Sequence, residues 1–405
     1  MIDNRFAPRA ACLIYPAVNE VFDVMRLIHI ADTHLGLAAF PVLNPETGAN
    51  LREELMYENF LSSIEKILAC RPDALVHAGD LFHHVKPKTR AYTTVLAALD
   101  RLAESGIPFI GIAGNHSMIK ARYTVSPFEV LEFHAADVHI AYRFRYERVE
   151  CAGACFHLIP NMLRPEDYRH AFDEITLSAS MPNVLVTHGL ATILADRRLQ
   201  TVAEHEIDAT MLSDDFSYIA LGHFHGQVPV TQNAWYAGSP EYCNYGEIGD
   251  VKGGLSVDPE KGMITHLDLP HTPMLDLGKI DCAGLSGKDI AERILALAGD
   301  VRDMHAMCLV TLIGARQDQT RSLDRKAIHA GSGHLLDLKV RIFSGEEDSA
   351  VFERVGLDGA DYLQEFASFI AGWDISEGMR ERVRQTGRAV LRDVICRHEE
   401  KDHAP

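Results

Sequence analysis

Histidine, aspartate and asparagine recur where apolar segments of this 405-residue chain end. The candidate side chains are Asp32, His34, Asp80, His83, Asn115, His116, His188, His223 and His225. Carboxylate, amide and imidazole groups are ligands of borderline and hard divalent metal ions, and the set contains no thiolate of the kind that structural zinc sites use. Any one of these residues alone is more often a turn or capping residue. Their recurrence in five segments predicts a shared metal centre.

Asp80 is the residue around which we expect the others to gather. It follows the apolar run 74–78 and precedes a helix beyond Pro87. Its carboxylate should therefore project from the carboxyl edge of a sheet, where open α/β folds build their sites. Asp32 and His34 are two residues apart on an extended segment and can bind one ion. The most specific local motif is GHFHG, because its glycines allow a sharp turn and its spacing lets both histidines reach neighbouring ions.

These ligand types predict two divalent ions that share the Asp80 carboxylate. We expect one ion to be held by Asp32, His34 and His225, and the other by Asn115, His188 and His223. Two ions about 3.5–4 Å apart can acidify a shared water, bind phosphate oxygens and offset the charge of an in-line displacement. Phosphoester hydrolysis is therefore the predicted reaction. Mn²⁺ is the first choice for such a mixed site, and Fe or Zn could occupy the same ligands.

Hydrolysis also needs a histidine that is not a ligand, to protonate or stabilise the leaving alkoxide. We expect His116 in this role, since Asn115 places its backbone beside the ions. His83 lies three residues after Asp80 and is expected to orient the phosphodiester.

The composition is that of an ordinary globular protein with room for about two or three domains, at 47% apolar and 24% charged residues. The net charge of -18 disfavours contact with nucleic acid, so a DNA ligand would have to meet local basic patches or a partner subunit. Basic residues follow three of the candidate segments, although a solvated loop explains each of them equally well. They are Lys86, Lys88, Arg90, Lys120, Arg122, Arg197 and Arg198.

The eight cysteines are scattered without a Cys-x-x-Cys pair, which favours reduced thiols in an intracellular protein. The apolar run near the N-terminus is broken by Pro16 and Glu20, well short of the roughly 18 residues that span a membrane. No other segment is apolar for long enough. We therefore expect a cytoplasmic protein without a membrane span, in which residues 1–24 are a disordered extension or precede the true start at Met25.

Buried strands that alternate with amphipathic helices would position the candidate residues. Strands are expected over 26–31, 74–78, 109–113, 184–188 and 216–221, and helices over 51–68 and 89–104. This β-α-β alternation predicts a mostly parallel sheet with helices on its faces. Residues 141–150 alternate aromatic and charged side chains, which favours one half-buried strand over a nucleic-acid surface. Short strands over 227–269 are expected to form a second layer that completes the domain.

The chain divides into an extension over 1–24, a catalytic domain over 25–272, a small α+β domain over 273–345 and a helical tail over 346–405. A strand over 274–281 opens the small domain. A helix over 286–298 follows, with a capping box of Ser286 and Asp289 and a stop at Gly299. The apolar stripes of the tail either pack on this protein or dock another chain.

The ordered motifs DTHLG, GDLFH, GNHS, THG and GHFHG resemble those of the calcineurin-like metallophosphoesterase superfamily. Further stretches are similar to one branch of it, the DNA double-strand-break repair exonucleases that include SbcD-like nuclease subunits. These stretches are MRLIHIADTHLG, FSYIALGHFH and YAGSPEYCNYGE followed by KGG. The resemblance extends from Met25 to about Leu269.

The resemblance implies a β-sandwich flanked by helices in α/β/β/α layers, a small capping domain and C-terminal helices. It implies that the seven ligands hold two metal ions and that His83 and His116 are the two catalytic histidines. It also implies Mn²⁺-dependent 3′ to 5′ exonuclease action on duplex DNA ends and endonuclease action on single strands or hairpins. A homodimer is implied as well, with C-terminal helices that bind the coiled coil of an SbcC-like ATPase.

One residue departs from the family pattern. Ser117 stands where the family usually has the Asp of GNHD. Because this position is not that of a metal ligand, we expect altered surroundings of an active site and not an inactive one.

Two other functions fit the same residues. A small-molecule or cyclic-nucleotide phosphodiesterase would keep the chemistry, and the acidic composition favours it. A non-catalytic DNA-binding scaffold subunit would carry a vestigial site, but the retention of every ligand type argues against it. Nucleotide release from linear duplex DNA, compared with hydrolysis of bis(p-nitrophenyl) phosphate, distinguishes all three.

Overall fold

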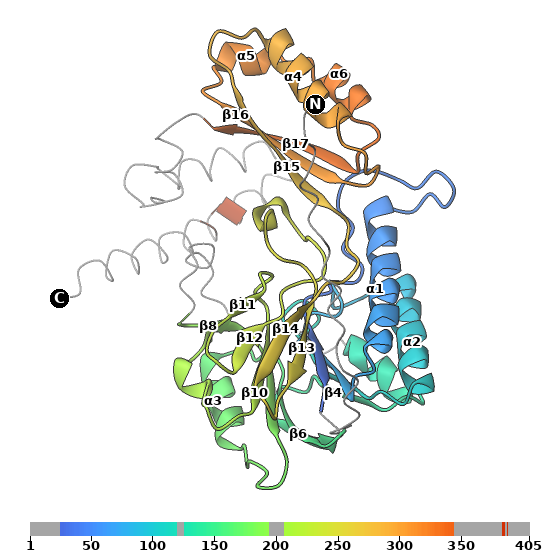
Figure 1. The fold of residues 1–405 in the computed structure, drawn as a ribbon, viewed down its shortest axis with the longest axis vertical. Helices are drawn as coiled ribbons and strands as arrows, with labels where there is room; N and C mark the ends of the chain where they lie inside the picture. The colour runs from blue at the N-terminus through green and yellow to red at the C-terminus, as the bar shows by residue number, and fades with distance from the viewer. Residues whose placement is uncertain (1–24, 120–124, 194–205, 344–382, 385–386, 388–405) are drawn as a thin grey trace, which may run out of the picture. The chain divides into compact units, whose positions relative to one another are not determined.

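The structure is a computed structural model that describes residues 25–119, 125–193, 206–343, 383–384 and 387 (Figure 1). The predicted extension over 1–24 lies outside the described residues, as does nearly all of the predicted helical tail over 346–405. Four of the basic residues considered above also lie outside them, namely Lys120, Arg122, Arg197 and Arg198.

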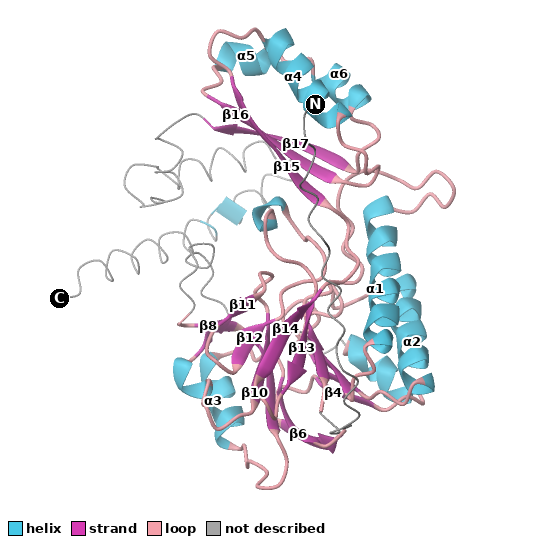
Figure 2. Ribbon diagram, in the orientation of Figure 1, coloured by secondary structure: helices cyan, strands magenta, loops and turns pink. Residues whose placement is uncertain are grey.

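Two mixed sheets of six strands each form the larger part of the described chain (Figure 2). The first sheet has the order β14-β13-β1-β2-β3-β4. Its strands are β1 (Leu27–Ile30), β2 (Ala74–His77), β3 (Phe109–Ile112), β4 (Val138–Ala141), β13 (Gly254–Asp258) and β14 (Met263–Leu267). Strands β1 to β4 are parallel, with Leu27 opposite Ala74, and β13 runs antiparallel to β1 and β14.

The second sheet has the order β11-β12-β10-β7-β6-β5. Its strands are β5 (Glu147–Cys151), β6 (Ala154–Ile159), β7 (Asn183–His188), β10 (Tyr218–Gly222), β11 (Val228–Pro229) and β12 (Ala234–Tyr236). Strands β6, β7, β10 and β12 are parallel, and the edge strands β5 and β11 are antiparallel to their neighbours. Both sheets are thus parallel at their centres, as the alternation of strands and helices predicts.

The two sheets and the helices on their outer faces form four layers (Figure 1), and apolar side chains fill the space between the layers. The core between the sheets includes Val76 of the first and Phe156 of the second. Helices α1 (Leu51–Ala69) and α2 (Thr89–Glu104) supply Ile64 and Leu99 to the core on the outer face of the first sheet. Helix α3 (Pro165–Asp173) supplies Tyr168 to the core on the outer face of the second. This α/β/β/α arrangement confirms the predicted fold class.

Two predictions about strands are wrong. The single strand expected over 141–150 is two strands, β4 and β5, because Phe144 takes a left-handed backbone (φ 53°) where the chain passes from one sheet to the other. The short strands over 227–269 do not form a layer of their own. Strands β11 and β12 join the second sheet, and β13 and β14 join the first. In each case, pairing with strands distant in the sequence decides the outcome.

A three-stranded sheet in the order β15-β16-β17 comes next in the chain. It contains β15 (Met274–Asp281), β16 (Met307–Ile313) and β17 (Asp337–Phe343), with the helices α4 (Gly287–Gly299), α5 (Gln317–Arg321) and α6 (Arg325–Gly331). The predicted capping box of α4 is present. Ser286 N donates to Asp289 Oδ2 at 2.9 Å, and Asp289 N donates to Ser286 Oγ at 3.2 Å.

The chain forms two compact units. The first runs to Gly278 and includes Ile294–Val310 and Arg325–Lys339. The second includes Lys279–Arg293, Thr311–Asp324 and the described residues from Val340 onward, namely 340–343, 383–384 and 387. Because the strands of the small sheet are divided between the units, the domain boundaries predicted from the sequence stay a proposal.

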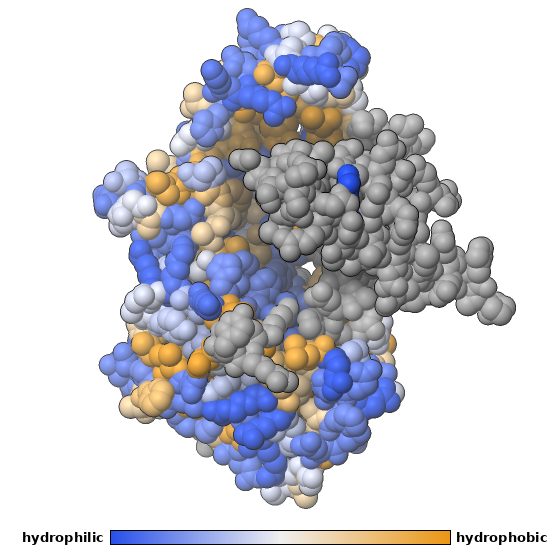
Figure 3. Space-filling view, turned by 180° about the vertical axis from the view of Figure 1, so that it is seen from behind, coloured by the Kyte–Doolittle hydropathy of each residue, from blue (hydrophilic) through white to orange (hydrophobic). Residues whose placement is uncertain are grey.

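The short elements are the strands β8 (Leu190–Ala191) and β9 (Glu206–Ile207) and the 3₁₀ turns η1 (Pro127–Phe133), η3 (Ala209–Met211) and η4 (Tyr245–Glu247). Polar surface predominates on the face shown in Figure 3, with separate apolar patches. In the described part of the chain, no helix combines the length and the apolarity that crossing a membrane requires.

His29 on β1 is a buried histidine that makes the stability of the fold depend on pH. Its Nδ1 lies 2.8 Å from the hydroxyl oxygen of Tyr218, and its side chain is 0% exposed. Burial, and after it the nearby His77, lower the pKa of His29 from 6.5 to about 3. Between these two values the unfolded chain binds a proton that the folded chain does not, so acid destabilises the fold.

We expect the free energy of unfolding to fall as the pH drops below about 6.5, by about 1.4 kcal/mol per pH unit for His29 alone. A His29→Gln variant should lose this part of the slope, because glutamine does not titrate yet still offers a polar group to Tyr218. Urea unfolding at a series of pH values measures the slope, with the exposed His305→Gln as the control. If the two variants showed the same slope, His29 would not be the titrating group.

Candidate metal centre

The candidate residues lie at one edge of the sandwich. Each is at or just past the carboxyl end of a parallel strand: Asp32 and His34 after β1, Asp80 and His83 after β2, Asn115 and His116 after β3, His188 at the end of β7, and His223 and His225 after β10. Parallel strands end at the same edge of their sheet, which is the usual place for a site in an α/β fold.

Imidazole rings from four segments form one half of the cluster. The Nε2 atoms of His34 and His225 are 3.1 Å apart, and the Nδ1 atoms of His34 and His83 are 3.2 Å apart. The His83 ring stacks on His116, with centroids 4.9 Å apart. The backbone N–H of His116 donates to Asp80 Oδ1 at 2.9 Å. These contacts connect three of the loops to Asp80.

Asp80 and Asn115 connect the other half. Asp80 Oδ2 lies 3.4 Å from His188 Nε2. Asn115 Oδ1 lies 3.0 Å from the same nitrogen and 3.2 Å from His223 Nδ1. The backbone N–H of His223 donates to both carboxylate oxygens of Asp32, at 3.1 and 3.0 Å. All nine residues predicted from the sequence therefore belong to one continuous cluster.

Asp80 lies between the two halves. Its Oδ2 is 3.9 Å from His34 Nε2 and 3.4 Å from His188 Nε2, the position that a bridging carboxylate requires. Asp32 was assigned with His34 and His225, but its carboxylate also lies within 4.8 Å of the ligand atoms of Asp80 and His188. Asp32 can therefore reach either ion position.

The donor set fits two divalent ions. Asp32, Asp80 and His188 are 0%, 1% and 0% exposed, and buried polar groups of this kind need a positive partner or a metal. The facing Nε2 atoms of His34 and His225 must share a proton or a cation, because two lone pairs 3.1 Å apart repel. Oxygen and imidazole donors converging from five loops meet this need with metal ions.

The charged forms of the central pair stabilise each other. Burial alone would raise the pKa of Asp80, but His188 and then His34 outweigh it and hold this pKa below its ordinary value. Burial alone would lower the pKa of His188, but Asp80 and then Asp32 raise it. Burial raises the pKa of Asp32. Asp80 and His188 thus shift each other's pKa in opposite directions at the centre of the cluster.

Backbone strain gathers at the same residues. Four of the candidate ligands have positive φ: Asp32 at 51°, His34 at 44°, Asp80 at 53° and His223 at 102°. Left-handed backbone is unfavourable for residues other than glycine and persists where the surrounding structure enforces it, often at functional sites. These turns aim the side chains at the cluster instead of along the strands.

Two glycines allow the loops to approach one another. A Cβ at Gly114 would collide with the backbone N and Oδ1 of Asp80. A Cβ at Gly222 would collide with the carbonyl oxygen of Ala78, which accepts a hydrogen bond from His188 Nδ1 at 2.8 Å. Any larger residue at either position would displace a candidate ligand.

The sequence profile of the Calcineurin-like phosphoesterase family matches residues 25–255. The chain belongs to this family. The phosphoesterase is therefore a hydrolase of phosphoester bonds, and its family uses the kind of two-metal chemistry that the ligand types predict.

Curated relatives of the chain that are named for DNA repair support the DNA-repair branch of this family. DNA double-strand break repair protein Mre11 of Methanopyrus kandleri is 30% identical over 56% of this chain and 51% of that protein. The protein of the same name from Methanococcus maripaludis is 27% identical over 60% of this chain and 67% of its own. The protein of that name from Haloferax volcanii is 28% identical over 89% of this chain and 74% of its own length. The chain thus spans about half the length of the first relative and about three quarters of the last.

Two of the candidate ligands, His188 and His225, are oriented by hydrogen bonds to groups that are not candidate ligands. The carbonyl of Ala78 holds His188 Nδ1, which leaves Nε2 to face the cluster. Glu247 Oε1 lies 2.8 Å from His225 Nδ1 and does the same for that ring. Lys252, whose side chain is 0% exposed, donates to Glu247 Oε2 at 2.7 Å. Glu247 and Lys252 stand in the stretch YGE and KGG, but nothing in their spacing indicated a link to His225.

A Glu247→Gln variant of the phosphoesterase should bind metal about 10–100-fold more weakly, because Gln no longer holds His225 Nδ1 by a charged hydrogen bond. Isothermal titration with Mn²⁺ measures the change, and thermal unfolding in parallel shows whether the buried Lys252 has destabilised the fold. The matched control is the exposed Glu260→Gln. Equal Mn²⁺ affinity in the two variants would show that Glu247 does not position His225.

His116 is the exposed residue of the cluster. His83 is half-buried, as are Asn115, His223 and His225. Burial, then His116 and His84, lower the pKa of His83 to about 4. Ser117 beside them is 0% exposed, and its hydroxyl has no hydrogen-bond partner among the described residues. His116, which is predicted to act on substrate, is therefore at the open side of the cluster, and the His83 ring stacks on it.

The basic residues that follow Asp80 are mostly neutralised. Lys88 Nζ lies 2.6 Å from Glu53 Oε2, and Arg90 Nη1 lies 2.5 Å from Glu54 Oε1. Lys86 is exposed. Three of the basic residues considered from the sequence are in the described chain. Of these three, Lys86 is the one that is exposed and forms no ion pair.

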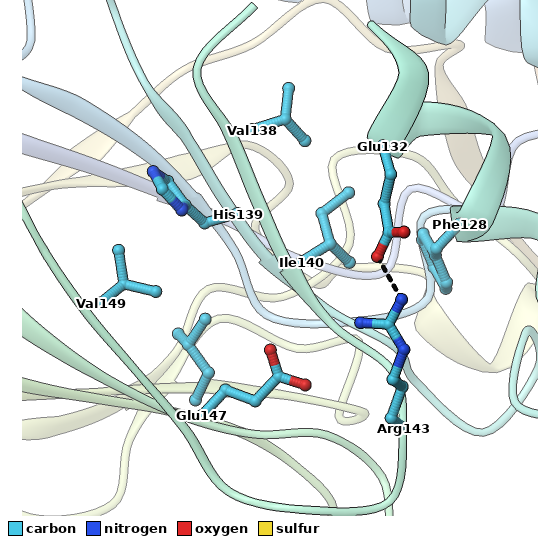
Figure 4. Close-up of a pocket in the computed structure, with 9 residues that line it drawn as sticks. Phe128, Glu132, Val138, His139, Ile140, Arg143, Glu147 and Val149 are labelled. Carbon is cyan, nitrogen blue, oxygen red and sulfur yellow. Dashed lines mark hydrogen bonds and ion pairs between the residues drawn. The ribbon is translucent and has the colours of Figure 1, made fainter.

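A separate cavity of about 170 Å³ is lined by residues of η1, β4 and β5 (Figure 4). Val138 and Ile140 line it, and Arg143 and Glu132 form an ion pair of 2.6 Å at its side. No candidate ligand is among its lining residues. The cavity is therefore not the metal centre.

Proposed function

We propose that the protein is a metal-dependent DNA nuclease that hydrolyses phosphodiester bonds in DNA repair. The observation that carries this proposal is the continuous cluster of nine residues with Asp80 between two sets of ligands. The curated relatives named for DNA double-strand break repair support DNA as the substrate. The proposed reactions are 3′ to 5′ exonuclease action on duplex ends and endonuclease action on single strands or hairpins.

The seven ligands would hold two divalent ions, for which Mn²⁺ is our first choice, with Fe or Zn as alternatives. When bound, such ions would polarise the phosphodiester and lower the pKa of a bound water. Asp32, Asp80 and His188 are buried, so these ligands would be shielded from bulk water.

His116 would supply the proton for the leaving oxygen. Its Nδ1 lies 3.2 Å from the carbonyl oxygen of His83, which can only accept a hydrogen bond, so Nδ1 carries a hydrogen. Nε2 is therefore the nitrogen that exchanges a proton with the departing alkoxide. The stacked ring of His83 fixes the orientation of His116 and borders the same open side, where it would orient the phosphodiester.

The proposed partners are DNA, a second copy of the chain and an SbcC-like coiled-coil ATPase. Exposed apolar side chains in the segment around η1 support a homodimer, with Val125 at 67%, Val130 at 47% and Phe133 at 88% exposure. Helices of 346–405 would bind the ATPase, residues 273–345 would cap the catalytic domain over 25–272, and the complex would act in the cytoplasm. The sequence stripes of the tail support this docking role.

A second candidate function is a small-molecule or cyclic-nucleotide phosphodiesterase. The net charge of -18 and the pairing of Lys88 with Glu53 and of Arg90 with Glu54 favour it, since these charges are not free to bind a DNA backbone. The same metal centre would serve both substrates.

End-labelled linear duplex DNA tests the proposal. With Mn²⁺, we expect nucleotides to be released from a 3′-labelled end, hairpin DNA to be cut, and EDTA to stop both. Hydrolysis of bis(p-nitrophenyl) phosphate without any DNA cleavage would establish the second candidate instead. Silence on both substrates at full metal occupancy would overturn both functions.

A further inference from the structure

Cys243 lies at the metal centre, although the ligand set predicted from the sequence contains no thiolate. Its Sγ, a ring nitrogen of His34 and a ring nitrogen of His225 lie within 4.8 Å of one another. The thiol is half-buried and free, so it is not consumed by a disulfide. Three donor atoms at this spacing surround the volume of one ion.

The loop that carries Cys243 is held by the carboxylate that orients His225. The backbone N–H of Cys243 donates to Glu247 Oε2 at 3.0 Å, and the side-chain amide of Asn244 donates to Oε1 at 2.7 Å. Glu247 itself is fixed by Lys252 and His225, at 2.7 and 2.8 Å. The thiol is thus presented to the cluster by a preorganised loop and not by a mobile side chain at the surface.

The two imidazoles beside the thiol face each other. His34 Nε2 and His225 Nε2 lie 3.1 Å apart, an arrangement that calls for a cation between them. Cys243 lies where it would complete the coordination of that cation.

We infer that Cys243 is a thiolate ligand of the ion shared by His34 and His225, and that it biases this position toward a thiophilic ion such as Zn²⁺. A thiolate added to Asp32, His34, His225 and the shared Asp80 favours Zn²⁺, which accepts sulfur ligands, over Mn²⁺, which prefers oxygen donors. On coordination the thiol loses its proton to solvent. This inference rests on the proposed two-metal function and deepens it, because it makes the two ion positions chemically unequal.

Cobalt absorption spectroscopy of the full-length protein tests the inference. Co²⁺ bound by imidazole and carboxylate gives visible d–d bands, and a thiolate ligand adds a charge-transfer band in the near ultraviolet. We expect the wild-type protein to show both signals. Cys243→Ser should keep the d–d bands and lose the charge-transfer band, and Cys243→Ala should do the same. The control Cys155→Ser changes a buried thiol on β6 and should keep both.

The outcomes separate this inference from the proposed function. The d–d bands without a charge-transfer band in the wild type would overturn the thiolate ligand and leave the metal centre intact. A charge-transfer band that persists in Cys243→Ser would overturn it too, because another thiol would be the source. If the wild-type protein bound no Co²⁺, both the thiolate ligand and the proposed two-metal function would be wrong. Competition with Zn²⁺ adds a second readout, in which Cys243→Ser should lose about tenfold or more in Zn²⁺ affinity and less in Mn²⁺ affinity.

Discussion

An Asp80→Ala variant is expected to lose both metal binding and phosphodiester hydrolysis. Asp80 Oδ2 lies 3.9 Å from His34 Nε2 and 3.4 Å from His188 Nε2, so its removal takes the shared ligand from both ion positions. It also removes the only carboxylate oxygen described within 3.4 Å of Nε2 of the buried His188. Metal analysis after dialysis should give fewer than two ions per chain, and DNA cleavage should fall to the level of the EDTA-treated wild type.

Asp80→Asn and an exposed control refine this test. Asparagine keeps an oxygen that accepts a hydrogen bond from the backbone N–H of His116, but it removes the negative charge. Loss of metal from Asp80→Asn would therefore be due to the missing charge and not to a disrupted backbone turn. The exposed Asp300→Ala should bind two ions and cleave DNA normally. Retention of two ions by Asp80→Ala would show that Asp80 does not bridge them.

A His116→Gln variant is expected to keep both ions and lose turnover. His116 is exposed and contributes its backbone N–H to Asp80, which glutamine preserves, while the imidazole that would donate the proton is gone. Loss of a general acid typically lowers kcat by about 10²–10⁴-fold. Steady-state cleavage of labelled duplex DNA measures kcat, and titration with Mn²⁺ measures the ions.

The matched control is His139→Gln, a half-buried histidine on β4 that borders the separate cavity. It should cleave DNA at the wild-type rate. A native rate in His116→Gln would assign the proton transfer to another group, whereas loss of metal from it would make His116 a ligand.

The types and places of the main site residues could be read from the sequence. Each of them follows an apolar strand whose hydrophobicity predicts burial, and parallel strands bring their carboxyl ends to one edge. Local signals sufficed in the same way for the start of α4, where Ser286 and Asp289 cap the helix within one turn. Such features depend on neighbours only a few residues away.

Pairing between distant segments required the folded structure. The strand expected over 141–150 is broken at Phe144, because β4 pairs with β3 in one sheet and β5 with β6 in the other. The strands of 227–269 are divided between the two sheets, because β13 pairs with β1 and β12 with β10. Periodicity specifies which face of a strand is apolar, but not which sheet it joins.

The roles of Cys243 and Glu247 also required the folded structure. They lie 18 and 22 residues after His225 in the sequence, in a stretch whose composition is that of a loop. Only the folding of that loop over the sandwich brings a thiol to His225 and a carboxylate to its Nδ1. A ligand on a strand end is predictable because the sheet places it, whereas a group on a connecting loop acquires its partners from tertiary packing alone.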